Sequence, residues 1–236
     1  MKPMDNQGSG VQAQLLEAAC KVFADKGYRD ATIAEICETA GANIAAVNYY
    51  FRGKETLYGE AWRLAFQRSL EAYPPDGGVP ASASAEERLR GRIISLVQRI
   101  INPENHEFEI IRKELANPTG LLEEVMRESI EPLAMSLSAL VRELLGDNAP
   151  ELQVRLCQMS IMAQCLHPMM RRRFQKLFAD SPALPNKPLP QSSSIEIIAE
   201  HIIQFSLAGI KEIRRRIETG EHSGQAYSDD EFNWQL

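Results

Sequence analysis

The chain has 236 residues, of which 44% are hydrophobic and 25% charged, and its formal net charge is −6. This length and composition are typical of one or two folded domains, and the acidic balance argues against a protein that coats nucleic acid without sequence preference. Because no apolar run reaches the roughly 18 to 20 residues that span a bilayer and the first ten residues resemble no secretion signal, we expect a cytoplasmic protein with no membrane partner.

Helix-start and helix-stop signals divide the first 73 residues into four predicted helices. Ser9 begins the first helix through a capping box with Gln12, and Gly27 ends it. Thr32 caps the second helix through a box with Glu35, and the next helices follow without a long break. The predicted ranges are about 10–26, 32–40, 44–50 and 52–73.

A change in composition after Tyr73 marks a domain boundary, because "PPDGGVPASASA" is typical of a loop. The later helices are predicted at about 86–102, 106–116, 119–145, 150–179 and 194–218. Between the last two, "DSPALPNKPLPQSSS" predicts an irregular surface crossing. We therefore predict an all-α fold with a first domain of residues 1–73, a second of 74–219 and a flexible tail of 220–236.

Residues 32–51 have the spacing of a helix-turn-helix motif, in which Gly41 ends one helix and Asn43 caps the next. A rotation of 100° per residue places Ile44, Val47 and Phe51 together on the face that we assign to the core. The outward positions are then Ala45, Ala46 and Tyr49, with Asn48 and Tyr50 at the edges. Such a face is unusual on a helix that contacts only solvent.

DNA binding explains this face, because small side chains admit a helix to the roughly 12 Å wide major groove and an alanine methyl can meet the thymine methyl. Tyrosine hydroxyls, asparagine amides and the Lys54 ammonium suit phosphate oxygens. Charge gives little support, since residues 27–58 contain three basic and four acidic side chains. The alternative is that Tyr49 and Tyr50 pack against the first and fourth helices.

The segment "LLEAACKVFADKGYRDATIAEICETAGANIAAVNYYFRGKETLY" resembles the N-terminal DNA-binding domain of the TetR family of bacterial transcriptional repressors. It contains the motifs F-x-x-x-G, T-x-x-x-I-x-x-x-A-G and Y-x-F-x-x-K-x-x-L. The resemblance implies that the third helix contacts bases through Ile44, Ala45 and Ala46, and that the other positions contact the DNA backbone. The predicted DNA-binding residues are Thr32, Asn43, Ile44, Ala45, Ala46, Asn48, Tyr49, Tyr50 and Lys54.

The chain departs from the family pattern at two positions in this segment. Asn48 stands where the family more often has Tyr, and Gly53 replaces the usual Ser or Thr cap before the fourth helix. The resemblance therefore does not carry over one phosphate contact or the stability that a cap gives to the fourth helix. Downstream, "FEIIRKELANPTGLLEEVMRESIEPLAMSLSALVRELLG" resembles the subgroup of repressors related to the regulator CecR.

The family resemblance implies a homodimer formed by the last two helices and a cavity for a small molecule. The last predicted helix is apolar over more of its circumference than one core stripe requires, which also favours a dimer built as a four-helix bundle. The alternative is a fully buried helix of a monomer. The predicted interface residues are Ile198, Ile202, Phe205, Ala208 and Gly209.

Residues 157–170 contain an unusual number of sulfur-bearing side chains and one His, the ligand types of a soft metal such as Cu(I). They are also consistent with a pocket for an apolar compound, or with core or dimer packing. These residues are Cys157, Met159, Met162, Cys165, His167, Met169 and Met170. We name no metal ligand and no cofactor, and the candidate contacts for an unidentified small-molecule effector are Arg112, Gln158, Met162 and His167.

The sequence contains no nucleophile elbow, P-loop, dinucleotide fingerprint or H-E-x-x-H, so an enzyme is not expected. We predict a homodimeric repressor that binds double-stranded operator DNA of palindromic sequence and is released by a small-molecule effector. The alternatives are a metal- or thiol-responsive regulator and a DNA-binding protein that responds to no ligand.

Overall fold

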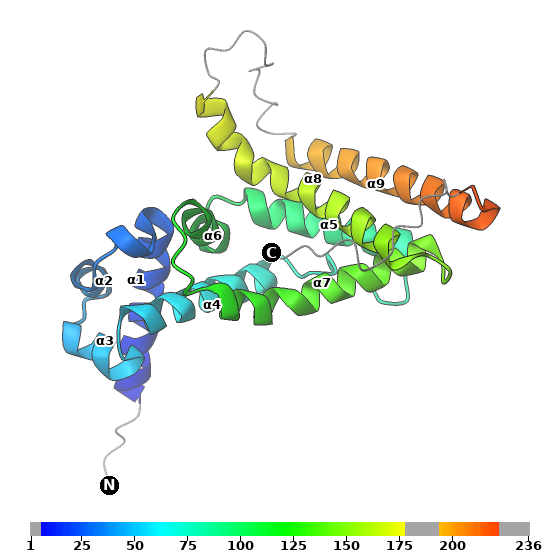
Figure 1. Ribbon diagram of the computed structural model, residues 1–236. Helices are drawn as coiled ribbons and strands as arrows, with labels where there is room; N and C mark the ends of the chain where they lie inside the picture. Colours follow the sequence, from blue (N-terminus) through cyan, green and yellow to red (C-terminus); the bar gives the residue numbers. More distant parts are fainter. Residues whose placement is uncertain (1–5, 178–193, 222–236) are drawn as a thin grey trace. The chain divides into compact units, whose positions relative to one another are not determined.

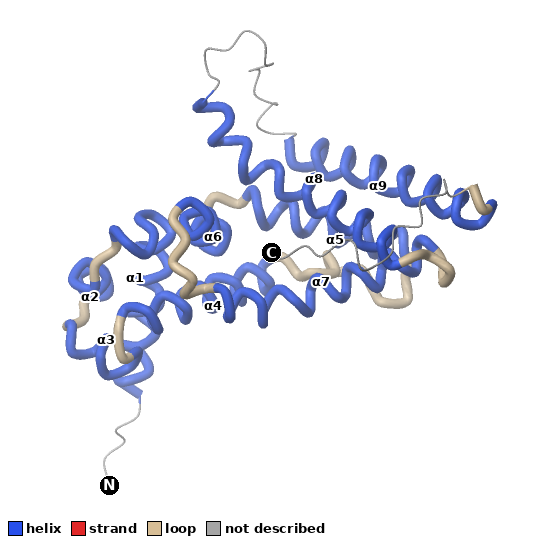
Figure 2. Tube along the Cα trace, in the orientation of Figure 1, coloured by secondary structure: helices blue, strands red, loops and turns tan. Residues whose placement is uncertain are grey.

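A computed structural model describes residues 6–177 and 194–221, and the regular structure in these ranges is helical throughout (Figures 1 and 2). The predicted all-α fold is thereby confirmed. The prolines between the last two helices and all but two residues of the predicted tail lie outside the described residues. The helices are α1 (Asn6–Asp30), α2 (Ile33–Ala40), α3 (Ile44–Phe51), α4 (Lys54–Ala72), α5 (Ala85–Ile101), α6 (His106–Ala116), α7 (Glu123–Leu145), α8 (Glu151–Leu177) and α9 (Ser194–Thr219).

The caps predicted around α2 and α3 are confirmed. The Thr32 hydroxyl accepts a hydrogen bond of 3.2 Å from the backbone N–H of Glu35, and Asn43 Oδ1 accepts one of 3.1 Å from the N–H of Ala46. Gly41 ends α2 with φ at 64°, a left-handed conformation that glycine adopts without steric cost. Local side chains therefore determine where the two helices begin and end.

Two predicted helix starts are wrong. α1 begins at Asn6, before Ser9, so Ser9 lies inside the helix. A capping box marks a helix start only where the preceding residues leave the helix, and no proline separates Asn6 from Ser9. α7 begins at Glu123, because Gly120 has φ at 77°, outside the helical region, while the N–H groups of Thr119 and Gly120 donate to Glu114 Oε1.

The chain divides into two compact units that alternate along the sequence. Among the described residues, the first unit contains 6–74 and 98–132, and the second contains 75–97, 133–177 and 194–221. In the first unit, α1 packs against α2, α4 and α6. The residues after 98 that include α6 thus belong to the same compact unit as the predicted helix-turn-helix.

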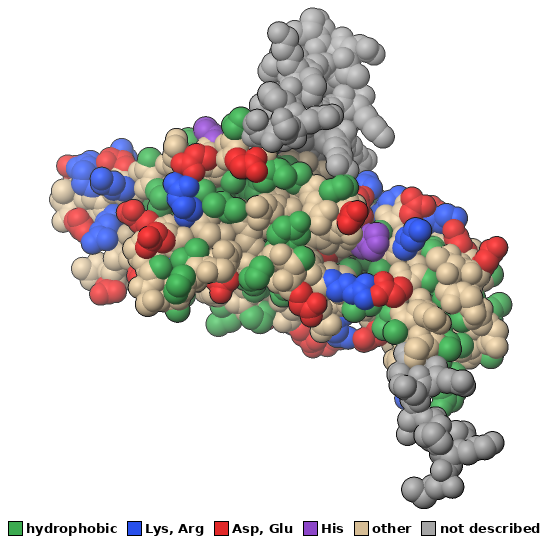
Figure 3. All heavy atoms as spheres, turned by 180° about the vertical axis from the view of Figure 1, so that it is seen from behind, with side chains coloured by type: hydrophobic (Ala, Val, Ile, Leu, Met, Phe, Trp, Pro, Cys, Tyr) green, Lys and Arg blue, Asp and Glu red, His purple; other side chains and the backbone are tan. Residues whose placement is uncertain are grey.

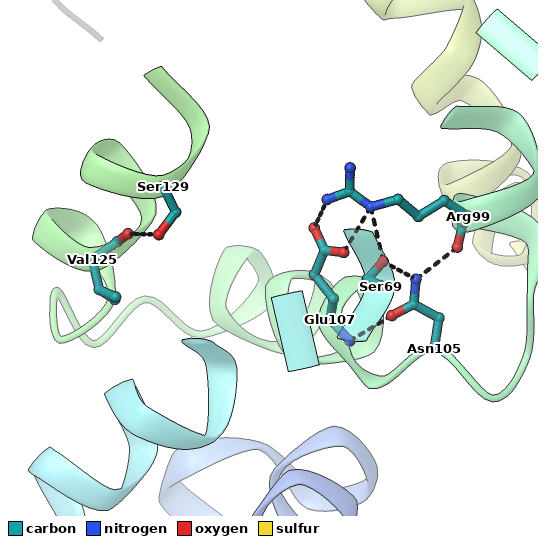
Figure 4. A network of polar contacts seen from close by, with 6 residues as sticks. All are labelled: Ser69, Arg99, Asn105, Glu107, Val125 and Ser129. Atoms are coloured by element: carbon teal, nitrogen blue, oxygen red, sulfur yellow. Dashed lines mark hydrogen bonds and ion pairs between the residues drawn. The ribbon is translucent and has the colours of Figure 1, made fainter. Parts of the chain in front are cut away.

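A buried ion pair lies inside the first unit, where α4, the end of α5 and the start of α6 meet (Figure 4). Arg99 Nη2 lies 2.6 Å from Glu107 Oε1, and Arg99 Nε donates to Ser69 Oγ at 2.8 Å. Asn105 Nδ2 donates to the same hydroxyl at 2.7 Å and to the Arg99 carbonyl, while its Oδ1 caps α6 by accepting from the N–H of Glu107. The network joins three helices through charge-assisted hydrogen bonds.

In the second unit, α8 and α9 pack against each other along one face of each helix. The buried side chains recur every three or four residues, which is the spacing of one helix face. They are Val154, Cys157, Ile161 and Cys165 on α8, and Ala199, Ile202, Ile203, Ser206 and Ile210 on α9. None of the described helices is long and apolar enough to cross a membrane.

Candidate nucleic-acid interface

The core face of the helix-turn-helix consists of Ile36 on α2 with Val47 and Phe51 on α3, all of which are buried as predicted. Ile44 is different, because its side chain is 53% exposed. The prediction that Ile44 lies in the core is therefore wrong. The buried side chains of α3 are Val47 and Phe51, so the residues before Val47 extend past the packed core.

The outward face of α3 is exposed and contains few charges. Tyr49 is 81% exposed, and its ring meets that of Tyr50 edge to face with 4.9 Å between the centroids. This exposure excludes the alternative that Tyr49 packs against α1 or α4. The exposed members are Ile44, Ala45, Asn48 and Tyr49, and the half-buried ones are Ala46 and Tyr50. Thr32 and Asn43 are also exposed, so all nine predicted DNA contacts except Lys54 lie on α3 or at the start of α2 or α3.

Lys54 begins α4 next to the end of α3 and lies above the ring of Tyr28, with 4.4 Å between the ammonium nitrogen and the ring centroid. Partial burial lowers the pKa of Lys54 from its ordinary value, opposed by the nearby Asp30 carboxylate. Tyr28 in turn packs against Tyr58, with 5.1 Å between the ring centroids. The cation is thus held in place by an aromatic cluster instead of by an acidic partner.

Gly53 precedes α4 without a side-chain cap. Its backbone has φ at 150° and ψ at −179°, a conformation almost restricted to glycine. This conformation explains the departure from the family pattern, because the Ser or Thr that usually occupies this place would be strained here. The helix therefore begins without a side-chain cap, although the Gly53 carbonyl accepts a hydrogen bond of 3.2 Å from the N–H of Leu57.

Few cations near α3 are free to meet a phosphate. Lys26 forms an ion pair with Glu35 of α2, at 2.5 Å. Arg29 donates to the carbonyl of Pro118 at 3.4 Å. Arg52, which the sequence-based site omits, is exposed directly after α3. The family motif leaves its position unspecified, so only its charge could have indicated a role.

The candidate effector contacts belong to two units. Arg112 lies on α6 in the first unit, where it is exposed and paired with Glu109 at 2.5 Å. The other three lie on α8 in the second unit, where Gln158 donates to the Ala134 carbonyl at 3.0 Å, Met162 is half-buried and His167 is exposed. An open groove in the second unit includes none of them, and its lining residues are Met135, Ser138, Ala139, Arg142, Glu143 and Asp147.

The sulfur-bearing residues of α8 lie on different faces of the helix. Cys157 and Cys165 are buried, whereas Met159 and His167 are exposed. Within the described ranges, no three or more His, Cys, Asp or Glu side chains are grouped as metal ligands would be. The side chain of Met170 lies outside the described residues.

The predicted dimer residues of α9 also divide between two faces. Ile202 is only 3% exposed and packs within its own chain, so its assignment to the dimer interface is wrong. It shares the buried face with Ala199 and Ile203, one helical turn or less away. Phe205 is 63% exposed, and Ala208 and Gly209 lie on the exposed side of the helix with it, while Ile198 is half-buried.

Comparison with known proteins identifies relatives for both parts of the chain. The model for bacterial regulatory proteins of the tetR family matches residues 15–61, and the model for the C-terminal domain of the HTH-type transcriptional dual regulator CecR matches residues 85–210. The chain is 27% identical over 177 residues to the HTH-type transcriptional dual regulator CecR of Shigella flexneri, which covers 69% of this chain and 77% of that protein.

Solved structures share the fold at low sequence identity. The fatty acid degradation regulator FadR from Bacillus halodurans matches with a TM-score of 0.62 and 16% identity, over 84% of this chain and 98% of that one. FadR from Bacillus subtilis, solved in complex with stearoyl-CoA, matches with a TM-score of 0.63 and 17% identity, over 84% and 98% of the two chains.

Proposed function

Because the chain belongs to the TetR family of bacterial transcriptional regulators, with a C-terminal domain of the CecR type, we propose that it is a homodimeric repressor released from its operator by a small molecule. It is a DNA-binding regulator and not an enzyme. The observation that carries the proposal is the exposed face of α3, on which Tyr49 and Ala45 are available to a partner although neither carries a charge.

In the proposed complex, α3 lies in the major groove. Ile44, Ala45 and Ala46 meet base edges and thymine methyl groups, and their small or apolar side chains bring the helix close to the bases. The polar groups around them contact phosphates and fix the position of the helix on the duplex. These groups belong to Thr32, Asn43, Asn48, Tyr49, Tyr50 and Lys54.

The homodimer is supported by apolar side chains on the outer faces of α8 and α9. Ile197 and Phe205 on α9 are more than half exposed, as is Met159 on α8, and Leu156 lies one turn before Met159. Two helices with buried inner faces and apolar outer faces can form a four-helix bundle with a second copy. Such a dimer would place two recognition helices on half-sites about 34–36 Å apart along the DNA.

A small-molecule effector is supported by one solved structure of the same fold and by one buried N–H group without a hydrogen-bond partner. FadR from Bacillus subtilis was solved with stearoyl-CoA, which belongs to that protein. In this chain, the indole N–H of Trp62 on α4 is buried without a hydrogen-bond partner among the described residues. A ligand that accepts a hydrogen bond from this N–H would remove the free-energy cost of the unpaired donor. The coupling free energy between ligand binding and DNA binding would be about 1–3 kcal/mol.

A thiol-responsive regulator is less well supported than a ligand-responsive one. All four cysteines are buried, and burial raises the pKa of Cys20 and of Cys165 to about 12. Burial also raises the pKa of Cys37 and Cys157. Because the thiolate is the reactive form, these side chains are poorly suited to sense oxidants.

The proposal is tested by selecting duplexes from a random-sequence pool with the purified protein and by footprinting it on the DNA upstream of its own gene. We expect a palindromic sequence to be enriched. Ala45→Lys should change the enriched sequence, whereas Tyr49→Ala should weaken binding to every duplex. Failure of the wild-type protein to enrich any sequence would contradict the proposed function.

A further inference from the structure

Arg52 occupies a backbone conformation that is unfavourable for its residue type. It ends α3 with φ at 59° and ψ at 0°, and its N–H donates to the Asn48 carbonyl at 3.1 Å. This position at a helix end normally belongs to Gly or Asn, because a larger side chain strains the left-handed conformation. Within the described ranges, Arg52 is the single residue other than glycine with a positive φ.

The side chain of Arg52 makes no polar contact that offsets this strain. It is exposed, and among the described residues no hydrogen bond or ion pair holds its guanidinium. Two other cations of this unit already have partners, because Lys26 forms an ion pair with Glu35 and Lys54 lies over the ring of Tyr28. Arg52 is therefore the free positive charge at the end of the recognition helix.

We propose that Arg52 contacts a phosphate of the bound DNA and that the strained end of α3 directs its guanidinium toward the duplex. The proposal rests on the DNA-binding function described above and adds a residue to it. Arg52 lies between Tyr50 and Lys54, whose side chains belong to the same proposed surface. A guanidinium binds phosphate with two parallel hydrogen bonds, whereas the neighbouring tyrosine hydroxyls carry no charge.

A simpler role for Arg52 is stabilisation of α3 through the partial negative charge at the helix C-terminus. The two roles predict different results for Arg52→Asn, because Asn tolerates the left-handed conformation and removes the charge. A phosphate contact predicts weaker DNA binding with an unchanged or higher melting temperature. A helix-stabilising role predicts a lower melting temperature and unchanged dependence of DNA binding on salt.

The experiment measures the affinity of wild-type protein and variants by fluorescence anisotropy, at salt concentrations from about 50 to about 300 mM. The probes are a duplex that the wild-type protein enriches and a random-sequence duplex of the same length. Each lost phosphate contact lowers the magnitude of the slope of log affinity against log salt by about 0.9. The affinity at 0.1 M salt then falls about 8-fold. For a dimer with two copies of Arg52, the loss is about 60-fold.

Two variants and a matched control make the result specific. Arg52→Lys keeps the charge and should retain most of the salt dependence, and Arg52→Gly removes the charge together with the backbone strain. Lys21→Asn removes one exposed charge from α1 that acts on His106 of α6, and should bind like wild type. Equal losses on both duplexes are expected for Arg52→Asn, because phosphates occur in every sequence.

A wild-type affinity and salt slope in Arg52→Asn and Arg52→Gly would overturn the proposal while leaving the DNA-binding function intact. A wild-type protein that enriches no sequence and binds neither duplex would instead contradict the proposed function itself. If Arg52→Asn unfolds, Arg52→Gly decides the question, since glycine adopts the observed conformation without strain.

Discussion

Tyr58 on α4 donates a hydrogen bond of 3.0 Å to Oε2 of Glu114, near the end of α6. The other oxygen of Glu114 accepts from the N–H and the hydroxyl of Thr119 and from the N–H of Gly120. One buried carboxylate thus joins α4 to the segment that leads into α7. α4 and α6 belong to the unit that contains the proposed DNA-binding surface.

Tyr58→Phe should lower the free energy of unfolding by about 1–3 kcal/mol, because it leaves Glu114 Oε2 without the donor that satisfies it. The loss can be measured by urea denaturation. Tyr49→Phe is the matched control, since the Tyr49 side chain is exposed and its hydroxyl is free to meet water. Equal stabilities of the two variants would show that the Tyr58–Glu114 bond contributes nothing net.

Removing either partner of the buried pair Arg99–Glu107 should cost about 3–5 kcal/mol, because the remaining charge would be buried without compensation. We expect Arg99→Met and Glu107→Leu to show this loss in urea denaturation. The double variant should lose less than the sum of the two. The guanidinium also stacks on Phe66 and Phe108, and Met preserves part of that apolar contact.

Arg68 and Glu17 provide the control for this prediction, since they form an ion pair of the same residue types at an exposed position. Arg68→Met should change the free energy of unfolding by only about 0–1 kcal/mol. A comparable loss at the exposed pair and the buried pair would contradict the argument from burial.

Protonation of His106 should destabilise the folded chain. Burial lowers the pKa of His106 below its ordinary value of 6.5, with Lys21 and Arg68 acting in the same direction and Glu17 opposing them. A histidine with a lowered pKa contributes stability above pH 6.5, which is lost as the pH falls through 6.5 toward the folded-state pKa. The free energy of unfolding should therefore fall between about pH 7.5 and about pH 5.5.

His106→Gln should reduce this fall in chemical denaturation measured at both pH values. Carboxylates such as Glu17, whose pKa is lowered mainly by its hydrogen bond from Arg68, lose their contribution at lower pH. An unchanged fall in the variant would assign the pH dependence to another group.

Local signals made the bounds of α2 and α3, and the buried face of α3, predictable from the sequence. The caps Thr32 and Asn43 and the stop at Gly41 act within four residues, so they do not depend on the rest of the fold. The burial of Val47 and Phe51 follows from helical periodicity. These few positions therefore determine the orientation of α3 and the face that it exposes.

The errors have a common physical cause. Helical periodicity identifies which side chains share one face of a helix, but it does not identify what packs against that face. It placed Ile44 in the core because it could not tell where the packed neighbours of α3 end. It placed Ile202 in a dimer because it could not distinguish burial within a chain from burial against a second copy. The start of α7 follows Gly120, and helical periodicity reveals neither the positive φ of this residue nor its hydrogen bond to Glu114 of the preceding helix.

The position of the Lys54 ammonium should depend on the ring of Tyr28 beneath it. Tyr28→Leu removes the aromatic face that attracts the cation, and we expect DNA affinity to fall about 2- to 5-fold, as suits a cation–π contact of about 0.5–1 kcal/mol. Tyr28→Phe retains the face and should bind like wild type. Fluorescence anisotropy on a duplex enriched by the wild-type protein measures both, and equal weakening in the two variants would assign the effect to the hydroxyl.

Phe205→Glu should weaken the proposed homodimer without unfolding the chain. Phe205 is largely exposed on α9, so a carboxylate there is solvated in the monomer and loses water only when a second copy covers it. We expect the dissociation constant to rise at least about 30-fold, corresponding to about 2 kcal/mol or more, in sedimentation equilibrium. Met135→Glu is the control, because Met135 is a similarly exposed apolar residue on α7, outside the proposed interface. Equal weakening by the two substitutions would show that the effect is one of added charge, and an unchanged dimer in Phe205→Glu would remove α9 from the interface.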